Sequence, residues 1–91
     1  MQAEMGPLTA ASHRVNRLST RQIAMLCRVS EGWTSAMLAR EWALADVTVR
    51  QSLGAAYRTL GVRDRTAAVV ALVIAARREL ARECQDERQA A

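Results

Sequence analysis

Arginine and glutamine side chains gather on one side of the segment 47–60, and no acidic residue shares that side. Projected as a helix at about 100° per residue, this side carries Gln51, Gly54, Ala55 and Arg58, with Arg50 at its edge. An arginine fork matches the two acceptors on the edge of guanine, and a glutamine amide matches the donor and acceptor of adenine. The residue types therefore suit contact with a nucleic-acid duplex.

The positive charge is concentrated in the part of the chain that contains this segment. Residues 12–65 hold nine Arg and four acidic residues, whereas residues 66–91 hold four of each. All 13 basic residues are Arg, and the chain has no Lys. This distribution indicates that the first part meets a polyanion and the second part meets protein.

Other chemistries have little support in the sequence. His13 is the only histidine and has no Cys or acidic residue placed to form a catalytic pair, while Cys27 and Cys84 lack the spacing of a zinc site. We find no paired carboxylates and no phosphate-binding loop, so we expect no enzyme, metal, cofactor or small-molecule ligand. The longest apolar run, 67–76, is too short to span a bilayer. With no signal peptide either, we expect a cytoplasmic, nucleoid-associated protein without a membrane partner.

The composition predicts an all-α fold, since 18 residues are Ala and only four are Gly and one is Pro. A first helix is predicted after the cap Ser19, whose capping box is completed by Gln22, and it should end at Gly32. A second helix is predicted to begin after the cap Thr34.

The third predicted helix, about 47–60, should be capped by Asp46 and closed by Gly61. Its buried side is predicted to consist of Val49, Leu53, Ala56 and Leu60. A fourth helix should begin near Thr66, capped by Asp64 or Thr66, and reach as far as Arg88 with frayed last turns.

The fourth helix has more apolar surface than one neighbour can cover. One stripe carries Val69, Val73, Ala76, Leu80 and Cys84, and Val70 and Ile74 project from a second side. The second cover is either the same helix of another copy, which we favour, or the N-terminal segment folded over it. We therefore expect a flexible tail over 1–16, a DNA-binding core over 17–69 and a dimerisation helix with a frayed end over 66–91.

The stretch 18–69 resembles the LuxR-type (GerE-like) helix-turn-helix DNA-binding domain, without a gap across 52 residues. The resemblance rests on Leu18-Ser19-Thr20-Arg21, Glu31-Gly32, Leu38-Ala39, Thr48-Val49-Arg50, Tyr57-Arg58-Thr59-Leu60-Gly61-Val62 and Arg63-Asp64-Arg65-Thr66-Ala67-Ala68-Val69. It implies a four-helix domain whose third helix enters the major groove, and an extended last helix that pairs two copies on an inverted-repeat site.

Site residues follow from the resemblance together with the helix projection. Base contacts are expected from Arg50, Gln51 and Gly54. Phosphate contacts are expected from Ser35, Thr48, Ser52, Arg58 and Arg65. The dimer interface is expected to include Val70, Ile74 and Arg77.

Some positions depart from the family pattern, which often has Lys at Ala36, His at Ser52 and Asn at Ala55. Either Gly54 and Ala55 let the helix sit deeper in the groove, or the module has kept its fold for a protein partner. We favour a stand-alone regulator, bacterial or phage, that binds double-stranded DNA as a homodimer. The alternatives are a module that binds the transcription machinery or another regulator, and an architectural DNA binder with little sequence preference.

Overall fold

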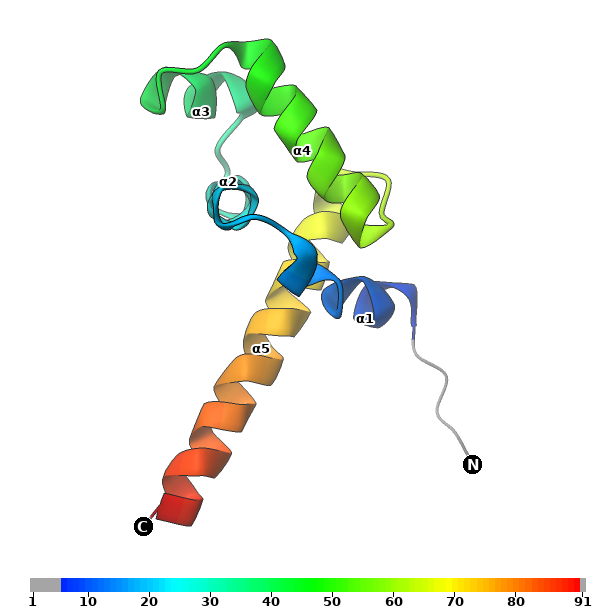
Figure 1. The fold of residues 1–91 in the computed structure, drawn as a ribbon, viewed down its shortest axis with the longest axis vertical. Coiled ribbons are helices and arrows are strands. Elements are labelled where there is room, and N and C mark those ends of the chain that lie inside the picture. The colour runs from blue at the N-terminus through cyan, green and yellow to red at the C-terminus, as the bar shows by residue number, and fades with distance from the viewer. Residues whose placement is uncertain (1–5, 91) are drawn as a thin grey trace.

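The computed structural model describes residues 6–90, and every regular element in that range is helical (Figure 1). The all-α prediction is confirmed. The elements in chain order are α1 (Pro7–Ser12), the 3-10 turn η1 (Val15–Arg17), α2 (Thr20–Ser30), α3 (Ser35–Glu41), α4 (Asp46–Leu60) and α5 (Arg65–Ala90).

Short polar side chains begin three of these helices as predicted. At α2 the Ser19 hydroxyl accepts from the Gln22 N–H at 3.0 Å, and Gln22 Oε1 accepts from the Ser19 N–H at 2.9 Å, which completes the capping box. Thr34 Oγ1 accepts from the Met37 N–H at 3.1 Å and begins α3. Asp64 Oδ1 accepts from the Ala67 N–H at 2.9 Å, so Asp64 rather than Thr66 serves α5.

Helix α4 begins one residue earlier than predicted and without a side-chain cap. Its N-cap is Ala45, and Asp46 is the first helical residue. The prediction that Asp46 caps the helix is therefore wrong. The other end is as predicted, because Gly61 closes the helix with a left-handed φ of 74°, which costs glycine little.

The core lies between α2, α3, α4 and the first turns of α5. Helix α4 buries Val49, Leu53, Ala56 and Leu60, the four residues predicted from the helix projection. They pack in one cluster with buried residues of the other elements, which are Ala11, Leu18, Met25, Leu26, Val29, Leu38, Ala39, Ala68 and Ala71. The cluster joins residues from every α-helix found between residues 6 and 90.

The N-terminal segment is more ordered than predicted. Residues 7–12 form α1, which packs against α5 and buries Ala11 and Ser12 (Figure 1). The Ser12 hydroxyl donates to the Thr9 carbonyl and accepts from the Arg78 guanidinium. The flexible tail predicted for 1–16 is thus wrong for α1, and residues 1–5 lie outside the described range. Helix α1 covers part of α5. This agrees with the second of the two covers considered for that helix, in which the N-terminal segment folds over it.

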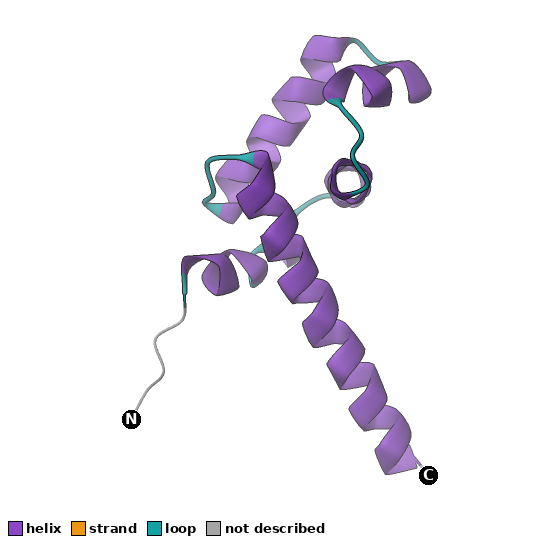
Figure 2. Ribbon diagram, turned by 180° about the vertical axis from the view of Figure 1, so that it is seen from behind, coloured by secondary structure: helices purple, strands orange, loops and turns teal. Residues whose placement is uncertain are grey.

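The fully buried residues of α5 are small, and two of its large aliphatic residues are exposed. Ala68 and Ala71 are fully buried, whereas Val73 is 45% exposed and Leu80 is 60% exposed. Val70 and Ile74 are half-buried. From Glu79 to Gln89 every side chain is exposed, and this part of α5 extends away from the other helices (Figure 2). Between residues 6 and 90, none of the helices is apolar enough over a sufficient length to cross a membrane.

The placement of Ala71 predicts a size limit at that position. We expect Ala71→Leu to lower the free energy of unfolding by about 1–3 kcal/mol, because the added atoms have no room against the core. Ala81→Leu is the matched control on an exposed part of the same helix, and it should change stability by less than about 0.5 kcal/mol. Urea unfolding measures both, and equal losses would contradict the orientation of α5.

Candidate nucleic-acid interface

Helices α3 and α4 form a helix-turn-helix. Residues 42–45 connect them, and α3 packs against α4 (Figure 1). The connection turns sharply at Ala43, which has a left-handed φ of 53°. The Leu44 N–H then donates to the Ala39 carbonyl at 2.8 Å, and the Leu44 side chain packs against the core. The turn thereby fixes the direction in which α4 leaves α3.

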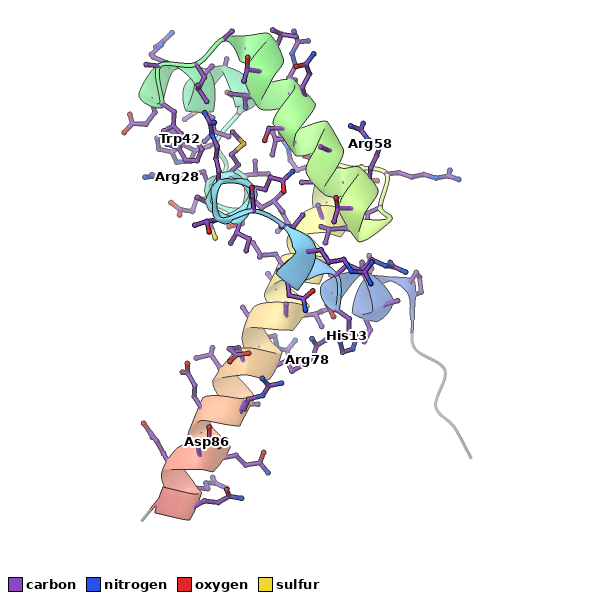
Figure 3. All side chains as sticks on the ribbon, in the orientation of Figure 1. His13, Arg28, Trp42, Arg58, Arg78 and Asp86 are labelled. Carbon is purple, nitrogen blue, oxygen red and sulfur yellow. The ribbon has the colours of Figure 1, made fainter. Side chains whose placement is uncertain are left out.

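The side of α4 opposite its buried residues faces solvent. Arg50, Gln51 and Arg58 are exposed there, while Gly54 and Ala55 are half-buried. Arg58 projects from the side of α4 that is turned away from α2 (Figure 3). The structure therefore places the predicted base-contacting residues and Arg58 on one exposed surface, which we call the α4 outer face.

Gly54 and Arg58 adjoin on this outer face. A Cβ atom built on Gly54 would lie 3.5 Å from Arg58 Nη1, so the guanidinium lies back over the glycine. Because Gly54 has no side chain, the backbone of α4 is less covered at this position than elsewhere on the outer face. A duplex on the outer face could approach the helix axis closely at this residue once the Arg58 guanidinium turns away from it.

Of the remaining predicted phosphate contacts, two lie on α4 and two lie on other elements. Thr48 is exposed in the first turn of α4 and Ser52 follows one turn later, half-buried. The Ser52 carbonyl accepts from Gln22 Nε2 at 3.4 Å, which joins this edge to the first turn of α2. Ser35 begins α3 and Arg65 begins α5, so these two residues lie on neighbouring elements rather than on α4.

An ion pair crosses the first turn of α4. Asp46 Oδ2 lies 3.1 Å from Arg50 Nε, and the two side chains are 48% and 64% exposed. Asp46 is the only acidic residue of α4. Asp46, which was predicted to cap the helix, instead forms an ion pair with Arg50, which is predicted to contact bases.

Sequence reasoning overlooked Val47. It is 50% exposed and lies in line with Gln51, Gly54 and Arg58, at successive spacings of four, three and four residues. An aliphatic side chain on a helix that enters the major groove can contact the methyl group of thymine. The helix projection contains the signal, because it places Val47 on the same side of the helix as these three residues.

The tryptophans lie apart from the outer face. Trp33 and Trp42 are half-buried and pack against the core. The Arg28 guanidinium lies 4.6 Å from the centre of the Trp33 ring, within the range of a cation–π contact. Arg28 and Trp42 both lie on the α2–α3 side of the domain, away from Arg58 (Figure 3). Their packing supports a structural role around the turn.

This arrangement, a short helix joined by a tight turn to a longer cationic one, defines the helix-turn-helix class of DNA-binding domain. The family model described as Bacterial regulatory proteins, luxR family, matches residues 16–72, which is more than half of the 91-residue chain. The chain belongs to this family, whose members are DNA-binding regulators of transcription rather than enzymes. No curated protein and no solved structure matches the chain.

The family match leaves out two parts of the structure. Helix α1 precedes residue 16, and α5 continues well beyond residue 72. These are the two segments that pack on each other through the contact between Ser12 and Arg78. The matched part contains the whole helix-turn-helix and the α4 outer face.

Gly54→Ala tests the glycine of the outer face. We expect the free energy of unfolding to rise by up to about 1 kcal/mol, because alanine favours the helix and its methyl group meets only Arg58 at an ordinary contact distance. Thermal unfolding should then rise by about 4–8 °C. Affinity for a duplex should fall, since the methyl group stands on the contact surface. A variant that is more stable and binds DNA as tightly as the wild type would remove Gly54 from the interface.

Proposed function

We propose that this protein regulates transcription by placing α4 in the major groove of duplex DNA as a homodimer. The observation that carries the proposal is the α4 outer face, which is exposed, rich in Arg and Gln, and directly opposite the four buried residues of the helix. A helix with this arrangement fits the width of the major groove. Duplex DNA as the partner implies a nucleoid-associated protein in the cytoplasm.

The proposed contacts divide into two kinds. Arg50 and Gln51 read base edges, and Gly54 lets the backbone approach them. Ser35, Thr48, Ser52, Arg58 and Arg65 contact phosphates and position the helix in the groove. Phosphate contacts supply affinity without sequence information, whereas base contacts supply specificity.

A second copy of the chain is the proposed partner on α5. Val73 and Leu80 are exposed, and Val70 and Ile74 are only half-buried within one chain. A helix that presents large aliphatic side chains to solvent gains stability when another copy covers them. Arg77 is exposed and lies between these residues on the same side of α5. Two copies related by a two-fold axis suit an inverted-repeat site.

One observation favours a second candidate function. Met37 is a large exposed apolar residue on α3, beside the exposed Ala36. An apolar surface on this helix suits a protein partner, such as a component of the transcription machinery. Under this alternative the chain would bind that protein and show no preference for any duplex.

Alanine substitutions of Arg50 and Arg58 distinguish a base contact from a phosphate contact. We expect Arg50→Ala to lower the discrimination between a selected duplex and mixed-sequence DNA by about 5- to 150-fold, the range of one bidentate base contact. Arg58→Ala should weaken binding to both duplexes alike and reduce the salt-dependence slope by about 0.9. The duplex is one selected by the wild type from a random pool, and fluorescence anisotropy at several salt concentrations measures both effects.

Arg88→Ala is the matched control, because it removes the same charge from the exposed far end of α5. It should bind both duplexes as the wild type does. If Arg50→Ala and Arg58→Ala also behaved like the wild type, the contacts proposed for α4 would be wrong. A wild type with no preferred duplex would exclude a sequence-specific regulator.

Exposed positions on α5 test the homodimer without disturbing the fold. We expect the wild type to sediment at twice the chain mass of 10.0 kDa, and Val73→Glu and Leu80→Glu to sediment as single chains. The reason is that each introduces a charge where two apolar surfaces would meet. Gln89→Glu is the control, because exposed Gln89 lies about five turns beyond buried Ala71 and therefore on the side of α5 away from Val73 and Leu80. A wild type that sediments as a single chain, or variants with unchanged mass, would contradict the dimer.

A further inference from the structure

We propose that Asp46 determines the base preference of α4 by holding Arg50 in a reading position. The inference rests on the proposed function, because it concerns how Arg50 meets a base edge. In this role Asp46 is a positioning residue that acts through the guanidinium of Arg50. Neither the family match nor the sequence pattern assigns it that role.

The geometry of the ion pair between Asp46 and Arg50 leaves the tip of the arginine side chain free. Asp46 Oδ2 lies 3.1 Å from Nε of Arg50, and Arg50 forms no other ion pair or side-chain hydrogen bond with the part of the chain from 6 to 90. The carboxylate thus occupies the donor nearest the side-chain stem and leaves the two Nη groups free. Two parallel donors at the tip of the side chain are what the O6 and N7 atoms of guanine accept.

The position of Asp46 and Arg50 on α4 favours the ion pair between them. Asp46 is the first residue of α4, where the positive end of the helix dipole favours a carboxylate. An acidic residue four positions before a basic one is also the favoured order for an ion pair on a helix. The carboxylate is therefore held at the N-terminal end of α4, one turn before Arg50.

The negative charge of Asp46 affects specific and non-specific DNA binding differently. An acidic residue beside a DNA-facing surface repels phosphates, so by itself Asp46 weakens binding to every duplex. The pair is exposed, with side chains 48% and 64% accessible, and exposed ion pairs add little to fold stability. A contribution to specificity accounts for the carboxylate, because it partly neutralises Arg50 towards phosphates while directing its free donors at a base.

Restriction of the Arg50 rotamers also favours sequence-specific binding over non-specific binding. A free arginine on the outer face samples many rotamers, several of which reach phosphates of any sequence. Pairing with Asp46 restricts these rotamers before binding, so less side-chain entropy is lost on reading a guanine. Exclusion of water on docking then strengthens the pair.

The test compares discrimination ratios in a set of variants. The two probes are the duplex selected by the wild type from a random pool and a mixed-sequence duplex. We expect Asp46→Asn to lower the ratio of the two affinities by about tenfold, within the range supplied by one bidentate contact. Affinity for the mixed-sequence duplex should rise, because a repelling charge is lost. Asp46→Glu, which can form the same pair, should retain most of the wild-type ratio.

A double variant distinguishes an indirect role from a direct one. If Asp46 acts through Arg50, Asp46→Asn combined with Arg50→Ala should discriminate no worse than Arg50→Ala alone. Additive losses would mean that Asp46 itself contacts a base, for example a cytosine amino group, and would overturn the positioning role.

Asp86→Asn is the matched control, since it makes the same chemical change on α5, far from the outer face (Figure 3). An equal change in ratio for Asp86→Asn would attribute the effect to net charge and overturn the inference. If Arg50→Ala lost discrimination while Asp46→Asn kept it, the inference would fail and the proposed function would stand. If neither the wild type nor any variant discriminated between the probes, both would fail.

Discussion

Burial of four residues along one side of α4 determines where every other side chain of that helix lies. Val49, Leu53, Ala56 and Leu60 are spaced by four, three and four residues and lie in the common core. Each larger aliphatic chain among them contributes roughly 1.5–3 kcal/mol when removed from water. The helix cannot rotate about its axis without exposing them, so its Arg and Gln residues are held outward. The cationic surface is thus a consequence of how the core packs.

Contacts at both ends of α4 keep this orientation. At the C-terminal end, Arg14 Nη1 donates to the Leu60 carbonyl at 3.0 Å, and Gly61 leaves room for the guanidinium. At the N-terminal end, the tight turn through Ala43 connects the helix to α3. Between these ends, Gln22 joins α2 to the Ser52 carbonyl. One residue on each neighbouring segment therefore helps to fix the position of the outer face.

The sequence predicted the elements whose signals are local or periodic. The capping box at Ser19, the glycine closure at Gly61 and the buried side of α4 each depend on a few neighbouring residues, and each is confirmed. Helix α1 was missed because six residues without an apolar period are stabilised by packing on α5 rather than by their own sequence. The role of Asp46 was misassigned because a carboxylate near a helix start suits both a cap and an ion pair. The pattern of α5 could not show which side faces the core, since Ala and Val are both apolar.

The packing of α1 on α5 makes two distant ends of the chain depend on each other. Helix α1 and the part of α5 after residue 72 lie outside the residues that match the family, and Ser12 and Arg78 meet between them. Loss of the first segment would uncover part of the last helix, and a shortened last helix would leave the first without its support. The two segments therefore support each other beside the helix-turn-helix, so a truncation at one end of the chain would be felt at the other.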